Sequence, residues 1–185
     1  HVQEIVLVLP ASKIEAGWCL VECGSWRKVT HICPGGERRQ DSVRCGLERL
    51  SPCHWVVVHD GARPCLDPAL VSLGLEAAAE TGAAVAAVPA KDTIKQATST
   101  GLVVRTIDRD GLWMVQTPQV FRYSLLVDSH QNCSTDVTDD AAMVESLGHK
   151  VKVFTGSYAN LKVTTSDDLL IAESLIRGHV PSHGK

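Results

Sequence analysis

Apolar runs and helix-like segments alternate through the first half of the chain. Ile5–Leu9 and Trp55–Val58 are continuous apolar runs, as in strands that are buried on both faces of a sheet. Helical spacing of apolar positions follows these runs. We predict strands at 5–9, 28–33, 55–58 and 83–88, and helices at 14–21, from 41 onward and at 69–80. This alternation predicts an α/β fold with a mostly parallel sheet and helices on both faces.

The middle of the chain departs from this pattern. Residues 92–96 and 102–107 predict two short strands, and the Thr98-Ser99-Thr100-Gly101 segment between them favours a hairpin turn. Polar and apolar positions alternate from 104 to 107, so we do not place these strands in the parallel sheet. A lone two-stranded hairpin is only marginally stable in water. We therefore predict a projecting antiparallel β-arm, about 92–113, that packs on a second subunit.

The last third returns to alternating elements. Helices are predicted at 124–130 and 139–147, a strand at 150–154 and a final helix from about 166. All of the predicted elements fit into a single domain, residues 1–185.

Composition and charge exclude several classes of protein. Hydrophobic residues make up 44% and charged residues 21%, as in an ordinary globular domain. The net charge of −3 argues against a nucleic-acid-binding surface, and no apolar run reaches the roughly 20 residues of a membrane span. Seven cysteines without a Cys-x-x-Cys pair indicate neither a disulfide framework nor a zinc module, and they suit free thiols in a reducing cytoplasm.

Asp60 stands at the end of a predicted buried strand, and Arg63 follows three residues later. Ligands of open α/β sheets bind at the carboxyl ends of the strands, where a carboxylate can hold Mg²⁺ against a phosphate. The neighbouring arginine suggests a phosphate or polyol ligand. The alternatives are a turn aspartate before Gly61 and a plain salt bridge between Asp60 and Arg63.

Three further segments have residues that could carry chemistry. Gly35-Gly36 and Ser42 connect a predicted strand to a helix, so the backbone could approach a ligand there or simply make a tight turn. Thr138-Asp139-Asp140 is most simply a helix N-cap. Lys162 lies in a short apolar segment, 160–164, that we predict as a strand, where a lysine needs an anionic partner.

Seven motifs, in order, resemble the 2-C-methyl-D-erythritol 4-phosphate cytidylyltransferase family. Each motif alone is weak, whereas their order over nearly the whole chain is specific. They are Gly35-Gly36-Glu37-Arg38-Arg39-Gln40-Asp41-Ser42-Val43, Val58-His59-Asp60-Gly61-Ala62-Arg63-Pro64, Pro89-Ala90-Lys91-Asp92-Thr93-Ile94-Lys95, Asp108-Arg109, Thr117-Pro118-Gln119-Val120-Phe121, Thr138-Asp139-Asp140-Ala141 and Asn160-Leu161-Lys162-Val163-Thr164. The resemblance implies a Rossmann-like nucleotidyltransferase fold. It also implies a reaction of the non-mevalonate isoprenoid pathway, in which the phosphate of methylerythritol phosphate attacks the α-phosphorus of CTP and pyrophosphate leaves.

The resemblance further implies a role for each matching residue. Asp60 would hold Mg²⁺, or another divalent ion, and a polyol hydroxyl. The polyol phosphate would be bound by Arg63, Thr93, Arg109, Thr138 and Lys162. CTP would be bound by Gly35, Gly36, Ser42, Asp60, Gly61 and Thr117. The implied catalytic residues are Asp60, Arg109 and Lys162.

The resemblance also implies an assembly and a location. The enzyme would be a homodimer in which Thr93 and Arg109, on or at the base of the arm, bind the polyol phosphate in the neighbour's site. It would act in the cytoplasm, or in the plastid of a plant or alga.

One part of the family's pattern has no counterpart in this sequence. The family opens with a strand and a Gly-rich basic loop around the triphosphate, and Pro10-Ala11-Ser12-Lys13-Ile14 carries no such loop. We therefore expect the domain to be N-terminally incomplete by about 50 residues. Two alternatives stay open. One is the sibling ribitol 5-phosphate cytidylyltransferase, against which Arg63 and the motif from Thr117 to Phe121 argue. The other is a non-catalytic nucleotide-binding or dimerisation module, if the loop is truly lost.

Overall fold

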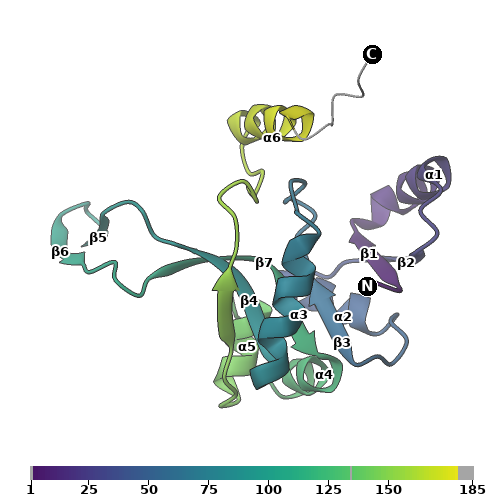
Figure 1. Ribbon diagram of the computed structural model, residues 1–185, viewed down its shortest axis with the longest axis horizontal. Helices are drawn as coiled ribbons and strands as arrows, with labels where there is room; N and C mark the ends of the chain where they lie inside the picture. The colour runs from purple at the N-terminus through teal and green to yellow at the C-terminus, as the bar shows by residue number, and fades with distance from the viewer. Residues whose placement is uncertain (1, 134, 179–185) are drawn as a thin grey trace.

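The structure is a computed structural model that describes residues 2–133 and 135–178. Figure 1 shows a sheet with helices packed on it, a hairpin that extends to one side and a smaller two-stranded sheet. The elements are β1 (Ile5–Leu9), the short 3-10 helix η1 (Ala11–Lys13), α1 (Ile14–Gly24), β2 (Val29–Pro34), α2 (Arg39–Leu47), β3 (Trp55–Val58), α3 (Ala69–Thr81), β4 (Ala83–Pro89), β5 (Ile94–Ala97), β6 (Val103–Ile107), β7 (Trp113–Arg122), α4 (Tyr123–Asn132), α5 (Asp140–Ser146), β8 (Lys152–Thr155) and α6 (Ser166–Gly178).

The main sheet is mixed, so the prediction of a mostly parallel sheet is wrong. Its strand order is β3-β7-β4-β8, with β4 and β8 parallel and β7 antiparallel to both of its neighbours. The physical reason is the path of the chain. Strand β4 leads out into the hairpin and β7 leads back, so that Pro89 pairs with Trp113 and Ala83 with Phe121. Two strands joined in this way must run antiparallel.

Strand β7 is a strand of the main sheet that the sequence pattern did not predict. Pro118 lies in its middle, and a proline argues against a central strand because it cannot donate to the ladder. The structure accommodates Pro118 in an irregular stretch. The pairing with β4 shifts between Val85 opposite Gln119 and Ala87 opposite Val115, so β7 has extra residues there.

The main sheet is covered by helices on both faces, as predicted. Strand β4 is buried along residues 83–88, and its side chains alternate between two cores. Ala84 and Ala86 face the core beneath α3, whereas Ala83 and Val85 face the core that α2, α4 and α5 cover. The continuous apolar run therefore reflects burial on both faces.

The first two strands form a separate parallel pair, β1 with β2, in the described residues. The expectation that Ile5–Leu9 is buried on both faces is not met, because its residues are half-buried and Ile5 is 36% exposed. Helix α1 packs beside this pair in Figure 1. The predicted strands at 28–33, 55–58 and 83–88 are all present.

Two other predictions concern segments outside the main sheet. Strands β5 and β6 pair antiparallel, from Ile94 opposite Ile107 to Ala97 opposite Val103, and they lie apart from the main sheet in Figure 1. Their role in a dimer stays a prediction. By contrast, the strand predicted at 160–164 is wrong, because these residues form an irregular loop. The helices in the described ranges are all too short or too polar to cross a bilayer.

Asp168 makes a reciprocal cap at the start of α6. Its carboxylate accepts hydrogen bonds from the backbone and hydroxyl of Thr164 at 2.9 and 2.8 Å and from the Thr165 amide at 2.9 Å. The Asp168 amide donates to the Thr165 hydroxyl at 3.2 Å. These bonds to the ionised form, those from Thr164 first, lower the pKa of Asp168 to about 2.

We expect the contribution of this cap to stability to depend on pH in a defined window. The folded pKa lies below the unfolded value of about 3.9, so the contribution is complete above about pH 4 and is lost as the pH falls toward 2. A carbon-13 NMR titration of the Asp168 carboxyl group should give a midpoint near 2. A midpoint close to that of an unstructured aspartate would contradict the capping geometry.

Candidate active site

Asp60 lies just beyond the end of β3 and faces three cationic side chains. Arg39 Nε is 3.3 Å from Asp60 Oδ1, Lys162 Nζ is 3.1 Å from Oδ2, and Arg63 Nε is 3.9 Å from Oδ2. These cations come from α2, from the loop before α6 and from the turn after β3. The Asp60 carboxylate therefore lies close to cationic side chains from three separate parts of the chain.

The charges around Asp60 keep it ionised. Burial raises the pKa of Asp60, but the hydrogen bond from Lys162 and the charges of Arg39 and Lys162 outweigh it. The pKa of Asp60 is therefore below its usual value. Arg39 is also neutralised by the buried Asp140, whereas Arg63 and Lys162 share the single charge of Asp60, so these two cations can attract a further anion.

A partly buried network holds the backbone at Asp60. The Asp60 amide donates to Thr117 Oγ1 at 3.0 Å, and the Thr117 hydroxyl is 3.0 Å from His59 Nδ1. His59 Nε2 is 3.1 Å from the Arg63 carbonyl, which can only accept a hydrogen bond. Burial lowers the pKa of His59 and favours the neutral ring. The ring therefore carries its proton on Nε2 and accepts the Thr117 hydroxyl at Nδ1.

The loop that carries Lys162 is anchored on both sides of the pocket. Asn160 is buried, and its side-chain amide donates to the Thr117 carbonyl at 2.7 Å. The backbone carbonyl of Asn160 accepts from Arg63 Nη1 at 2.7 Å. The Val163 amide donates to the Ala62 carbonyl at 2.7 Å. Lys162 itself is 46% exposed, so its side chain can turn from Asp60 toward a ligand.

A cavity of about 240 Å³ opens beside Asp60. It brings together five of the residues that the sequence singled out: Asp60, Arg63, Thr117, Thr138 and Lys162. Thr138 lies before Asp139, which is the N-cap of α5 and accepts a hydrogen bond from the Ala142 amide at 2.8 Å. The N-cap prediction for this segment is therefore confirmed, and the same segment contributes to the wall of the cavity.

The glycine-rich loop precedes α2, whose first residue, Arg39, lines this cavity. The Gly36 amide donates to Ser42 Oγ at 3.2 Å, and Ser42 Oγ donates to the Arg38 carbonyl at 3.2 Å. A Cβ atom on Gly35 would lie 2.7 Å from Ser42 Oγ, so a side chain there would displace the Ser42 hydroxyl. Gly61 differs, because a Cβ atom there would meet no atom within 4 Å. None of these four residues lines the cavity beside Asp60.

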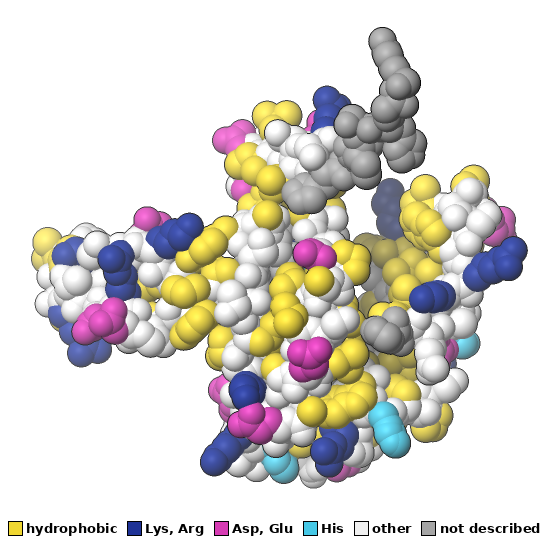
Figure 2. All heavy atoms as spheres, viewed as in Figure 1, with side chains coloured by type: hydrophobic (Ala, Val, Ile, Leu, Met, Phe, Trp, Pro, Cys, Tyr) yellow, Lys and Arg dark blue, Asp and Glu magenta, His cyan; other side chains and the backbone are white. Residues whose placement is uncertain are grey.

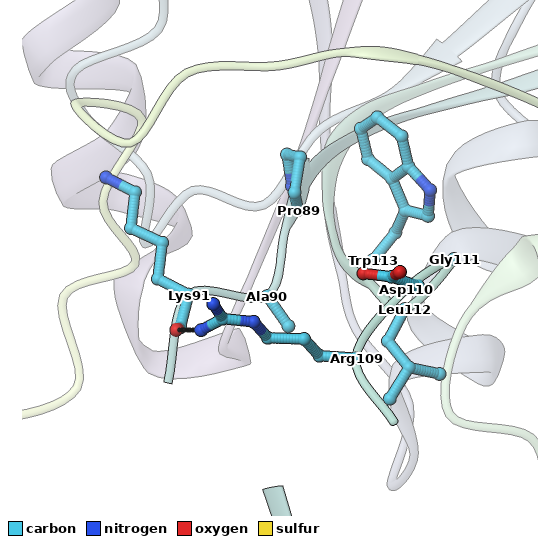
Figure 3. Close-up of a pocket in the computed structure, with 8 residues that line it drawn as sticks. All are labelled: Pro89, Ala90, Lys91, Arg109, Asp110, Gly111, Leu112 and Trp113. Atoms are coloured by element: carbon cyan, nitrogen blue, oxygen red, sulfur yellow. Dashed lines mark hydrogen bonds between the residues drawn. The ribbon is translucent and has the colours of Figure 1, made fainter. Parts of the chain in front are cut away.

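Arg109 and Thr93 also lie away from Asp60. Arg109 lines a separate pocket of about 510 Å³ at the base of the hairpin, together with Lys91 and Trp113 (Figure 3). Its guanidinium donates to the Lys91 carbonyl. The Lys91 ammonium is 3.3 Å from the centre of the Tyr158 ring. Thr93 lines neither pocket. Within one chain, therefore, the Asp60 cavity brings together only some of the predicted site residues.

A divalent ion at Asp60 would need ligands from outside this chain. In the ranges that the structure describes, no group of three or more His, Cys, Asp or Glu side chains is placed to hold a metal. One carboxylate surrounded by three cations is a poor site for a free ion. It fits an ion that arrives with a nucleotide, because Mg²⁺ is commonly held by one or two carboxylates together with substrate phosphates.

Sequence reasoning did not single out two charged residues at this site. Arg39 joins Asp60 to Asp140, with Nη1 2.6 Å from Asp140 Oδ2, and Asp140 is fully buried. Burial lowers the pKa of Arg39, but the two carboxylates, Asp140 first, outweigh it and raise the pKa. Arg39 stands inside the glycine-rich motif, so its charge was a usable signal. The sequence indicated Asp140 only as part of a helix N-cap.

Three comparisons with known proteins agree with one another. A family model described as IspD, 2-C-methyl-D-erythritol 4-phosphate cytidylyltransferase, matches residues 1–178. The enzyme of that name from Dehalococcoides mccartyi is 48% identical over 177 residues, which are 96% of this chain and 78% of the relative. Among solved structures, 4-diphosphocytidyl-2C-methyl-D-erythritol synthase from Anaerococcus prevotii has a TM-score of 0.84 at 29% identity, covering 95% of this chain and 79% of the other. The Thermus thermophilus cytidylyltransferase has a TM-score of 0.80 at 33% identity, covering 94% and 82%.

Proposed function

The chain belongs to the 2-C-methyl-D-erythritol 4-phosphate cytidylyltransferase family, and from this premise we propose that the cavity beside Asp60 is where it joins its two substrates. The enzyme transfers the cytidylyl group of CTP to 2-C-methyl-D-erythritol 4-phosphate and releases pyrophosphate, in isoprenoid precursor biosynthesis. The observation that carries the assignment of the site is the convergence of Arg39, Arg63 and Lys162 on Asp60 at the carboxyl end of β3.

The chemistry of the reaction explains why such a site needs several cations. A phosphate oxygen of the polyol substrate attacks the α-phosphorus of CTP, so two strongly anionic groups must come into contact. Guanidinium and ammonium groups neutralise the charge on the phosphate oxygens and hold the reactants in line. Arg63 is 11% exposed and is fixed by its bond to Asn160, so it acts as a rigid donor. The more exposed Lys162 can leave Asp60 for a phosphate oxygen.

Asp60 is proposed as the ligand of a divalent ion, Mg²⁺ in the simplest case. Such an ion, when bound, would neutralise phosphate charge at the α-phosphorus. Asp60 is ionised and displays Oδ2 on the side where Lys162 lies. The glycine-rich loop with Gly35, Gly36 and Ser42 is proposed to face the cytosine, beside Gly61 and Thr117. Thr138 and Arg63 are proposed to contact the polyol phosphate.

We further propose that the hairpin completes the site of a second subunit. Arg109 and Thr93 lie outside the Asp60 cavity, which agrees with their acting on a neighbour. Leu102, Val103 and Val104 on the hairpin are 60–70% exposed, and Trp113 at its base is 42% exposed. Figure 2 shows hydrophobic side chains at the surface where the hairpin joins the body. A homodimer would cover this apolar surface.

The two alternatives are weaker. The matched family and the relatives are methylerythritol phosphate enzymes, so ribitol 5-phosphate is not the favoured substrate. A non-catalytic nucleotide-binding or dimerisation module is not favoured either, because the matched family and the relatives are named as enzymes. We also propose that the enzyme acts in the cytoplasm, because the relatives are bacterial. It would act in the plastid only if the source were a plant or an alga.

A substrate panel tests this assignment. The full-length protein should release pyrophosphate from CTP with 2-C-methyl-D-erythritol 4-phosphate and be at least tenfold less efficient, as kcat/KM, with ribitol 5-phosphate. One misplaced or missing hydroxyl contact is worth about that factor or more. ATP, GTP and UTP serve as controls for the nucleotide. Equal efficiency with ribitol 5-phosphate would overturn the choice of polyol, and no pyrophosphate with either polyol would overturn the activity.

A further inference from the structure

Arg39 bridges two acids that play different parts. It is the first residue of α2, and its guanidinium reaches Asp60 Oδ1 through Nε at 3.3 Å and Asp140 Oδ2 through Nη1 at 2.6 Å. Asp140 is the first residue of α5 and lies 101 positions away in sequence. One planar side chain therefore ties the start of two helices to the acid at the end of β3.

The contact with Asp140 is the fixed end of this bridge. The Asp140 side chain is 0% exposed, and a buried carboxylate requires a cation and hydrogen bonds close to it. His130 Nε2 lies 3.4 Å from the other oxygen, Oδ1, but makes no hydrogen bond to it. Arg39 is thus the group that compensates the charge of Asp140 most directly. Asp140 does not line the cavity beside Asp60, so it does not reach a ligand there.

The two oxygens of Asp60 consequently face different kinds of partner. Oδ1 faces Arg39, which is held in place by a fully buried acid. Oδ2 accepts from Lys162, whose side chain is 46% exposed and free to turn away, whereas Arg63 Nε lies 3.9 Å from Oδ2 and makes no hydrogen bond to it. A ligand that enters the cavity can displace Lys162 more readily than Arg39.

We propose that Arg39 is a positioning residue that Asp140 anchors, and that this pair reserves Oδ2 of Asp60 as the oxygen that binds the divalent ion of the nucleotide complex. The inference rests on the proposed role of Asp60. Asp140 draws the guanidinium toward itself, which limits how strongly Arg39 competes with the metal for Asp60. Without the negative charge of Asp140, Arg39 pairs more closely with Asp60 and the metal binds less well.

The experiment measures Mn²⁺ affinity by electron paramagnetic resonance in the presence of CTP and without the polyol substrate. The variant Asp140→Asn keeps the shape of the side chain but removes its charge, and it should weaken Mn²⁺ binding about three- to tenfold. The double variant Arg39→Gln with Asp140→Asn removes the competing cation as well. It should recover wild-type affinity within twofold or bind Mn²⁺ more tightly. Arg39→Gln alone is avoided because it would leave Asp140 buried without its main partner.

Control variants separate the possible failures. Arg44→Gln removes an arginine from the same helix, where its side chain is 55% exposed, and should leave Mn²⁺ affinity unchanged. If Asp60→Asn binds Mn²⁺ as well as wild type, the proposed metal role of Asp60 fails and the inference fails with it. If Asp60→Asn binds more weakly but Asp140→Asn stays within twofold of wild type, the inference alone fails. It also fails if the double variant is as weak as Asp140→Asn, which is the result of a merely structural pair.

Discussion

Replacing Asp60 by Asn in the full-length protein is expected to lower the rate of cytidylyl transfer by about 10²- to 10³-fold or more, with the fold retained. Asn is nearly isosteric with Asp but carries no charge, so it cannot balance the three cations or hold a divalent ion as a carboxylate does. The loss should persist at saturating Mg²⁺. Pyrophosphate release under single-turnover conditions measures it most directly, and circular dichroism confirms the fold.

A matched control shows whether the loss of one negative charge elsewhere on the protein also lowers the rate. Asp128→Asn alters an exposed aspartate on α4 that does not line the cavity, and it should leave the rate within about twofold of wild type. If Asp60→Asn keeps the wild-type rate at saturating Mg²⁺, Asp60 is not the metal ligand, and the convergence of cations on it must serve another purpose.

Replacing Arg109 by Ala is expected to weaken binding of the polyol phosphate by about 10- to 100-fold while changing the KM for CTP little. A guanidinium that contacts phosphate through two hydrogen bonds is worth roughly this much, and Arg109 lies in a different pocket from Asp60. Separate KM measurements for the two substrates provide the test. Equal losses for both substrates would contradict a contact that is specific to the polyol phosphate.

Mixing Asp60→Asn with Arg109→Ala tests whether Arg109 acts on the neighbouring subunit, at a polyol phosphate concentration well below the raised KM of Arg109→Ala, where each variant alone has little activity. A heterodimer of Asp60→Asn and Arg109→Ala contains one site in which both residues are intact if Arg109 comes from the partner. Subunit exchange should then restore activity, up to about a quarter of the wild-type rate per total subunit when the two variants mix at random, because half of the dimers each regain one of two sites. No recovery, with heterodimers verified by native mass spectrometry, would place Arg109 in its own subunit's site and leave the hairpin as a structural clamp.

Local patterns in the sequence were sufficient to predict most elements of this fold. Apolar runs identified β3 and β4, although β4 is buried along residues 83–88 and β3 is mostly half-buried. Gly82, with a φ of +86°, ends α3 where the pattern stops. Strand β7 was not predicted because Pro118 in its middle argues against a central strand. The irregular pairing that accommodates Pro118 depends on the partner strand β4, which the local sequence does not reveal. The parallel sheet was inferred from the alternation of strands and helices alone. That alternation carries no information about β7, which returns antiparallel to β4.

The candidate site shows the same division between local and distant signals. Asp60 and Arg63 could be predicted because a strand end and a short spacing are local features. Lys162 was expected to need an anion, and the structure supplies Asp60, although the lysine lies in a loop instead of a strand. The ion pair between Arg39 and Asp140 joins residues 101 positions apart and depends on how α2 and α5 pack, so no local sequence pattern predicts it.

A crystal structure of the full-length protein with CTP and Mg²⁺ tests the central claim most directly. The α-phosphate should lie in the cavity beside Asp60, with the ion about 2.0–2.1 Å from Asp60 Oδ2 and the Lys162 ammonium turned away from that oxygen. Arg39 should still contact Asp140, as it does without ligand. A nucleotide whose α-phosphate and metal lie away from Asp60, at the hairpin pocket or elsewhere, would contradict the account.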